Sequence, residues 1–327
     1  MLSYILRRIV LMVPTLIGMT LLLFVLVRMA PGLTTGGGET GEMAKQAREA
    51  MEQRMKERLH LDKPLPEQYG LWLWDSVRGN LGTSIQYNES VWALIKERAP
   101  VTIVMNLIST FIVYLIAIPG GMLASVRRGK TFDVVWSFVT LALFSLPIIW
   151  VGDLLLAYLG NTHYLGWFPV AGSHATNTEW MTSVEYACDF LWHMVLPVTA
   201  LTLGGFAYLS KLQRAAILDN LGLDYVRTAR AKGNSGRVVM LRHVFRNSLL
   251  PMITASAGII PSLLGGSVVV ERIFSIKGMG DLLVTATTAR DLPIVQGVAL
   301  IGGVISLICL LITDIAYALA DPRVSYE

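Results

Sequence analysis

Six long apolar stretches, separated by polar segments, constrain the fold of this chain more than any other feature. An α-helix needs about 20 apolar residues to cross the hydrocarbon core of a bilayer, and each stretch is that long or longer. They occupy residues 9–30, 101–126, 132–159, 190–209, 249–270 and 294–320. Only 15% of the residues are charged, whereas soluble domains average about a quarter. The sequence therefore predicts an all-α integral membrane protein with six transmembrane helices.

The placement of Lys and Arg predicts how these helices are oriented, because short cytoplasmic loops carry an excess of both. Fourteen of these residues fall in the two termini and in the segments around 127–130 and 211–248, whereas only three fall in the short segments on the other side. We therefore expect cytoplasmic N- and C-termini. The first apolar run is long and is followed by Pro31-Gly32, so we interpret it as an uncleaved helix rather than a signal peptide.

The polar segments divide the chain into three parts. Residues 1–30 form a cytoplasmic N-terminus and the first helix. Residues 31–98, with nine Lys or Arg against ten Asp or Glu, are predicted to be an extracytoplasmic segment with an amphipathic helix over 42–59, where apolar residues recur every four positions. Residues 99–327 form the membrane core, which contains a cytoplasmic loop over 211–248.

The most informative polar segment is residues 219–251, which holds six cations against two acids. It reads as two short helices joined at Gly233, because glycine readily ends a helix. Three partners could explain its charge: anionic lipid headgroups, nucleic acid, or a cytoplasmic protein. The segment lacks an aromatic platform for nucleic acid. A loop that only sets topology needs cations but not a helix–glycine–helix order, so the pattern favours protein docking.

The sequence offers little chemistry of its own. We find no catalytic arrangement, no metal-ligand spacing among His163, His174 and His193, and no glycine-rich phosphate loop. We therefore expect no enzyme activity, metal or cofactor. Glycine pairs such as Gly120-Gly121 allow helices to approach closely, or they loosen helices that line a pathway. The polar residues proposed for a translocation pathway are Asn106, Asp153, Ser262 and Ser267. The alternatives are that Asp153 lies near an interface and that the serines bond to their own helices.

Residues 224–233, which read DYVRTARAKG, are followed by Arg242-His243 and by RNSLLP at 246–251. Together they resemble the coupling loop of binding-protein-dependent ABC importer permeases, in particular the peptide/nickel type. The resemblance extends to four further parts of the chain: 6–9 with 29–32, 61–66, 79–84, and 271–275 with 278–280 and 290–297.

The resemblance implies a multi-pass subunit of a bacterial or archaeal cell membrane, paired with a second permease, two cytoplasmic ATPase subunits that bind the ATP, and an extracytoplasmic solute-binding protein. It implies import of di- or oligopeptides. Alternatives are a nickel-chelate or other small solute and, from another class, a self-sufficient channel or ion-coupled carrier. A helix at 223–232 would sit in a groove of the ATPase. The implied coupling residues are Asp224, Tyr225, Arg227, Ala229, Arg230, Ala231, Lys232 and Gly233.

Overall fold

The computed structural model describes residues 2–29, 62–256 and 267–320. Within them the secondary structure is helical, apart from one isolated β-bridge between Thr83 and Ser90. The chain divides into two compact units. The first unit holds residues 99–281 and the chain from 306 onward, and the second unit holds residues 2–98 and 282–305.

Among the described residues, four helices are long and apolar enough to cross a membrane, and a bent helix pair makes a fifth candidate. The four are α1 (Leu2–Met29), α4 (Val91–Val126), α7 (Ser183–Leu221) and α15 (Leu292–Ala320). The pair is α5 (Thr131–Ser145) and α6 (Ile148–Leu155) with its continuation η1 (Leu156–Gly160). The remaining predicted span, 249–270, is described only at its ends, by α11 (Leu250–Ser256) and α13 (Val268–Ile273).

The apolar span predicted over 132–159 is formed by two helices and not by one straight helix. The chain bends by 92° between α5 and α6, and Leu146, the residue before Pro147, has extended dihedral angles of φ −78° and ψ 126°. Proline disfavours the helical conformation in the residue before it, so the break follows from local sterics.

Two further spans are longer than predicted. α4 begins at Val91 instead of residue 101. α7 begins at Ser183 because the Thr182 hydroxyl accepts a hydrogen bond from the Glu185 N–H, and the Glu185 carboxylate accepts one from the Thr182 N–H. This capping box satisfies two backbone donors that a helix start otherwise leaves unpaired.

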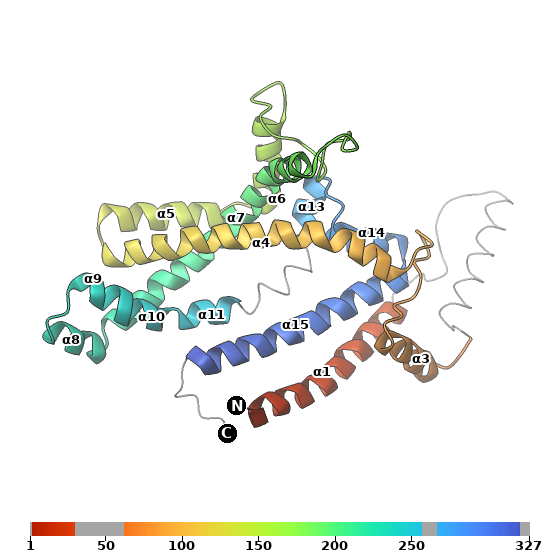
Figure 1. Ribbon diagram of the computed structural model, residues 1–327, viewed down its shortest axis with the longest axis horizontal. Helices are drawn as coiled ribbons and strands as arrows, with labels where there is room; N and C mark the ends of the chain where they lie inside the picture. Colours follow the sequence, from red (N-terminus) through yellow and green to blue (C-terminus); the bar gives the residue numbers. More distant parts are fainter. Residues whose placement is uncertain (1, 30–61, 257–266, 321–327) are drawn as a thin grey trace. The chain divides into compact units, whose positions relative to one another are not determined.

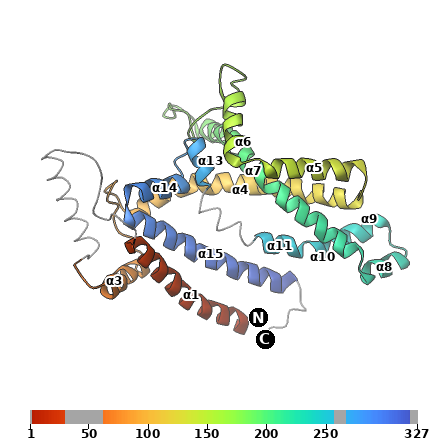
Figure 2. The same ribbon diagram turned by 180° about the vertical axis from the view of Figure 1, so that it is seen from behind.

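The first unit is built around α7. Figures 1 and 2 show α7 crossing α5 and α4 obliquely, with the short helix α8 (Asp224–Ala231) at the end of the bundle. One buried cluster includes Met105, Met194 and Phe274, and a second includes Val113 and Phe206. Outward-facing positions are also apolar, as expected where lipid is the solvent, and they include Phe111 and Phe138.

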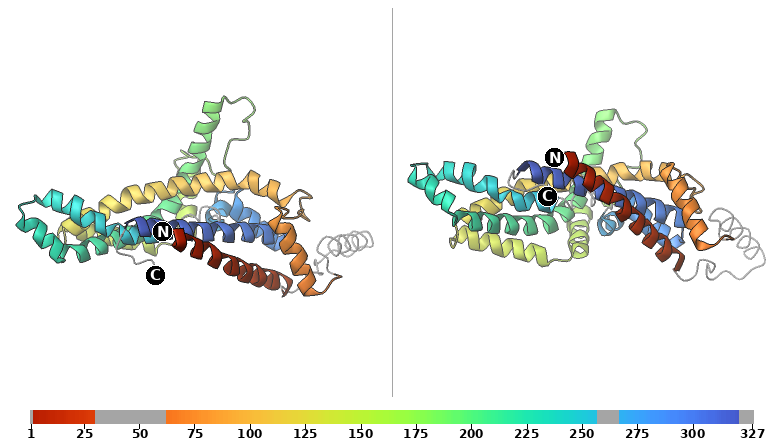
Figure 3. Two further views of the ribbon diagram at one scale, coloured as in Figure 1. Left: turned by 60° about the horizontal axis from the view of Figure 1, so that its bottom comes forward. Right: turned by 90° about the horizontal axis from the view of Figure 1, so that it is seen from below.

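The second unit packs α1 against α3 (Leu65–Val77) and runs α1 beside the beginning of α15, as Figure 3 shows. The Thr20 and Tyr69 hydroxyls lie 3.0 Å apart, and the Phe24 ring contacts Tyr69 and Trp72. α3 belongs to the predicted extracytoplasmic segment, whereas the amphipathic helix expected over 42–59 lies outside the described residues.

A buried carboxylate organises the turn that precedes α4 in the second unit. The Asp291 side chain, which lies between α14 (Met279–Ala289) and α15, is 1% exposed. It accepts hydrogen bonds from the Ser84 hydroxyl at 2.5 Å and from the N–H groups of Ile85 and Gln86, both at 2.9 Å. Hydrogen bonds to an ionised acceptor are among the stronger ones in proteins, so Asp291 holds this turn in place.

Candidate functional site

α8 follows the end of α7 almost directly and is tied to it. The Tyr225 hydroxyl donates to the Asn220 side-chain oxygen at 2.8 Å. Asp224 occupies the first turn, where its negative charge interacts favourably with the helix dipole. The Thr228 hydroxyl donates to the Asp224 carbonyl at 3.0 Å. α8 is therefore an ordered extension of the long helix α7.

Gly233 ends α8 in the left-handed conformation, with φ at +78°. The Gly233 N–H donates to the Arg230 carbonyl at 2.9 Å, and the Asn234 N–H donates to the Ala229 carbonyl at 3.3 Å. This pair of bonds is the Schellman arrangement, which satisfies carbonyls at a helix end. A Cβ added at Gly233 would meet no atom within 4 Å, so the backbone conformation alone requires glycine. The predicted helix break at Gly233 is confirmed.

The inner face of α8 is buried in an apolar cluster. Val226 is 0% exposed and Ala229 is 5% exposed. Both pack with Ile217 of α7 and with Val239 and Val244 of the following helix. We call these five residues the α8 seat. Because Ala229 lies inside the seat, it supports α8 and does not present its side chain to a partner.

The following helix returns toward the bundle in three short pieces. They are α9 (Gly236–Val238), η2 (Val239–Val244) and α10 (Phe245–Ser248), and η2 is π-helical. The second helix expected after Gly233 is confirmed. Only Val239 and Val244 among its aliphatic residues are fully buried, however, while Val238 and Leu241 are exposed. The π-helical stretch brings residues five apart onto one face.

The outer face of α8 is exposed and basic. Arg227, Arg230 and Lys232 are exposed, as is the small residue Ala231. Arg227 and Asp224 form an ion pair at 3.4 Å, but their side chains are 77% and 94% exposed, so this pair adds little stability. The cations are thus accessible to a partner, with small side chains between them that permit close approach.

The residues proposed for a pathway are not drawn together by hydrogen bonds within the part of the chain that the structure describes. The Asn106 amide donates to the Thr102 carbonyl of its own helix at 2.8 Å. Asp153 is exposed on α6, and Ser267 lies directly before α13, where its carbonyl accepts the Glu271 N–H. Ser262 lies outside the described residues. Their role in a pathway stays a prediction.

Two polar clusters in the structure were not predicted from the sequence. Glu271 is fully buried in the first unit, where it accepts hydrogen bonds from the Thr102 hydroxyl at 2.9 Å and from the Asp281 N–H at 2.8 Å. The second cluster joins Asp133 of α5 to Arg214 of α7. Each acid was visible as a charge at the edge of an apolar stretch, but its partner lies far away in the sequence.

A family model described as "Binding-protein-dependent transport system inner membrane component" matches residues 117–326. The oligopeptide transport system permease protein AppB of Bacillus subtilis is 37% identical over 327 residues, which cover 100% of both chains. The inner membrane ABC transporter permease protein YejB of Escherichia coli O157:H7 is 33% identical over 99% of both chains. A putative peptide transport system permease protein of Brucella suis biovar 1 is 35% identical over 100% of both.

Solved structures support the same fold. A chain of the inward-facing MetNI methionine ABC transporter, in its CY5 native crystal form, matches with a TM-score of 0.52 at 15% identity and covers 70% of this chain and 97% of that one. At this identity the likeness shows the fold alone. The family model and the relatives that align over the whole chain also show the function and the location: the protein is a multi-pass inner-membrane component of a transport system. This chain belongs to the family of binding-protein-dependent transport system permeases.

Proposed function

We propose that this chain is the membrane permease of an ATP-driven importer for di- or oligopeptides, and that α8 is the helix through which ATPase subunits act on it. The observation that carries the proposal is an exposed basic helix fixed on a buried seat. Full-length relatives named as oligopeptide and peptide permeases support the substrate class. ATP binding and hydrolysis then reside in partner subunits, and a solute-binding protein delivers the peptide.

The geometry supports a mechanical role for α8. Val226 and Ala229 lock α8 to Ile217, and Tyr225 bonds to Asn220. A push on the outer face of α8 is therefore transmitted to α7 without deforming the junction. α7 has 39 residues, which corresponds to a length of about 58 Å at 1.5 Å per residue. Rigid-body displacement of such a helix can turn a transport pathway from one membrane side to the other.

The full assembly in this proposal contains two permeases, two cytoplasmic ATPase subunits and one extracytoplasmic solute-binding protein. The second permease is a different chain, so the membrane part is a heterodimer. The permease has six transmembrane helices, of which the fifth includes α11 and α13, and both termini lie in the cytoplasm. This orientation puts α8 on the side where ATP is available. The basic loop also lies near anionic lipid headgroups, which its cations attract.

The test uses the complete importer, purified through this chain and reconstituted in proteoliposomes with its solute-binding protein. A tryptic digest of casein and a nickel–histidine chelate are offered separately, and uptake is measured by mass spectrometry with and without ATP. We expect ATP-dependent uptake of peptides. Uptake of nickel alone, or uptake that persists without an ATPase, would overturn the peptide importer in favour of a metal importer or a self-sufficient carrier.

A charge reversal tests the role of α8 separately. The double variant Arg227→Glu/Arg230→Glu alters only exposed side chains. It should lose co-purifying ATPase, because the basic surface becomes acidic while the α8 seat is untouched. Arg7→Glu, which changes an exposed arginine on α1, is the matched control and should retain the ATPase. Retention of the ATPase by the double variant would refute the docking role.

A further inference from the structure

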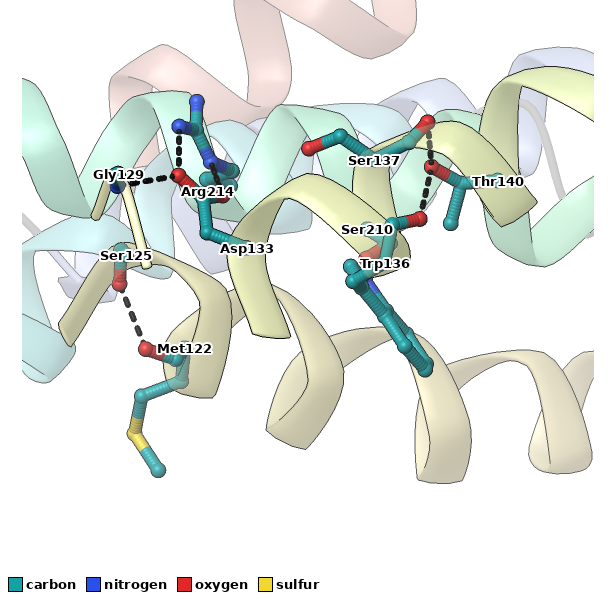
Figure 4. A network of polar contacts seen from close by, with 9 residues as sticks. All are labelled: Met122, Ser125, Gly129, Asp133, Trp136, Ser137, Thr140, Ser210 and Arg214. Carbon is teal, nitrogen blue, oxygen red and sulfur yellow. Dashed lines mark hydrogen bonds and ion pairs between the residues drawn. The ribbon is translucent and has the colours of Figure 1, made fainter. Parts of the chain in front are cut away.

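An ion pair joins α5 to α7, as Figure 4 shows. The Arg214 Nε donates to Asp133 Oδ1 at 2.7 Å, and its Nη2 donates to Oδ2 at 2.8 Å. The Gly129 N–H donates to the same Oδ2 at 2.9 Å. Asp133 is 4% exposed. A forked pair of this kind fixes both distance and direction between the two helices.

A second polar contact reinforces the same helix pair. The Trp136 indole N–H donates to the Ser210 hydroxyl at 2.7 Å (Figure 4). Trp136 lies about one turn beyond Asp133 on α5, and Ser210 lies about one turn before Arg214 on α7. α5 and α7 are therefore joined at two successive levels, in antiparallel sense. We call these four residues the α5–α7 brace.

The α7 half of the brace, Ser210 and Arg214, lies just before α8 along the chain. Arg214 precedes the end of α7 at Leu221 by seven residues, which is about 10 Å along the helix axis. The next helix on this side, α10, is joined to α7 as well, since the Gln213 amide donates to the Ser248 hydroxyl at 3.1 Å. A force that enters through α8 thus reaches the brace before it reaches the rest of α7.

Apolar packing alone is a weak way to hold two helices in register inside a bilayer. Lipid tails are as apolar as leucine, so sliding one helix along another carries little hydrophobic penalty. An ion pair between partly buried groups does little for net stability, but its geometry is specific. The α5–α7 brace is therefore better suited to fixing how α5 and α7 are aligned than to stabilising the fold.

We propose that Asp133 and Arg214 are positioning residues that make α5 move as one body with α7 when α8 is displaced. The inference rests on the proposed coupling role of α8. It assigns a task to α5: because α5 bends into α6 at Pro147, a displacement of α7 carries the bent α5–α6 pair with it. Without the ion pair, α7 would slide past α5 and the displacement would be lost between them.

The test measures the distance between α5 and α7 in the complete importer. Spin labels are placed at Val135→Cys on α5 and Tyr208→Cys on α7, whose side chains are 54% and 57% exposed. Cys188 and Cys309 are first replaced. Electron double resonance then reports the distance distribution without nucleotide and with ATP and vanadate. The variant is Asp133→Asn, which keeps the shape and removes the charge. The matched control is Asp75→Asn, an exposed aspartate on α3.

For the parent protein and the Asp75→Asn control, we expect one narrow distance that is the same in both nucleotide states. For Asp133→Asn, we expect a broadened distribution or a shift between the two states, with the ATPase still bound. An unchanged distribution in Asp133→Asn would overturn the inference, and so would a parent distance that changes with nucleotide. Failure of the proposed α8 docking would appear instead as retention of the ATPase by the Arg227→Glu/Arg230→Glu double variant, so the two failures are distinguishable.

Discussion

Replacing Gly121 by alanine tests whether α4 and α7 must approach as closely as the structure shows. A Cβ at Gly121 would lie 2.6 Å from the Ser210 carbonyl oxygen and 3.1 Å from the Gln213 Cβ. Ordinary contact begins at 3.4 Å, so the helices must separate locally by about 0.8 Å, as expected where added atoms enter a packed interface. The nearest atom, the Ser210 carbonyl oxygen, belongs to the backbone, so a side-chain rotation cannot relieve the clash.

The expected cost is about 1–3 kcal/mol, which is typical of overpacking a close interface. Gly204 offers a matched control on α7, because a Cβ there would meet no atom within 4 Å. Gly204→Ala should be neutral or stabilising by up to about 1 kcal/mol, since alanine is the better helix former. The two substitutions are chemically identical, and only the space around them differs.

Thermal stability of the purified permease in detergent, followed by size-exclusion chromatography after heating, compares the two variants. Gly121→Ala should lose its monodisperse peak at a lower temperature than the parent, and Gly204→Ala should not. Equal stability of the two variants would refute the close approach of α4 and α7.

Three further predictions concern named contacts. Gly233→Val should lower the free energy of unfolding by about 1–2 kcal/mol, because the left-handed conformation disfavours side chains with a Cβ. It should also weaken co-purification of the ATPase, whereas Gly233→Asn should largely retain the ATPase. Equal behaviour of the two variants would contradict the role of the left-handed cap. Ala229→Leu should overpack the α8 seat and lower the free energy of unfolding by about 1–3 kcal/mol. Leucine at the exposed position Ala231 should change it by less than about 0.5 kcal/mol. The reverse order would mean that Ala231, and not Ala229, faces the seat. Asp291→Asn should speed hydrogen exchange at the Ile85 amide, because a bond to a charged group worth about 1.5–3 kcal/mol is weakened; unchanged protection would show that the carboxylate does not hold the turn.

Apolar length and charge were enough to predict the main helices and the basic loop. Membrane thickness sets a minimum length for an apolar run, and that constraint acts within a single segment of sequence. Likewise, Gly233 needs only its own backbone conformation, so its role could be inferred from sequence. The basic character of α8 was visible in the sequence at Arg227 and Arg230.

The features that could not be predicted depend on contacts between distant segments. Asp133 and Arg214 are 81 residues apart, and neither shows its partner in the local pattern. The inward position of Ala229 depends on Ile217 and Val244. The bend at Leu146 is the exception, because its cause is local: the proline that follows is visible in the sequence.

The central claim is that α8 contacts an ATPase subunit, and site-specific photocrosslinking tests it most directly. Benzoylphenylalanine replaces exposed Ala231 in the complete importer, and the control position is Val134 on α5, which is 61% exposed on an apolar surface. On illumination, the Ala231 position should form an adduct between this chain and the ATPase, identified by mass spectrometry, and the Val134 position should form none. Absence of the ATPase adduct at Ala231 in a complex that still contains the ATPase would contradict the account.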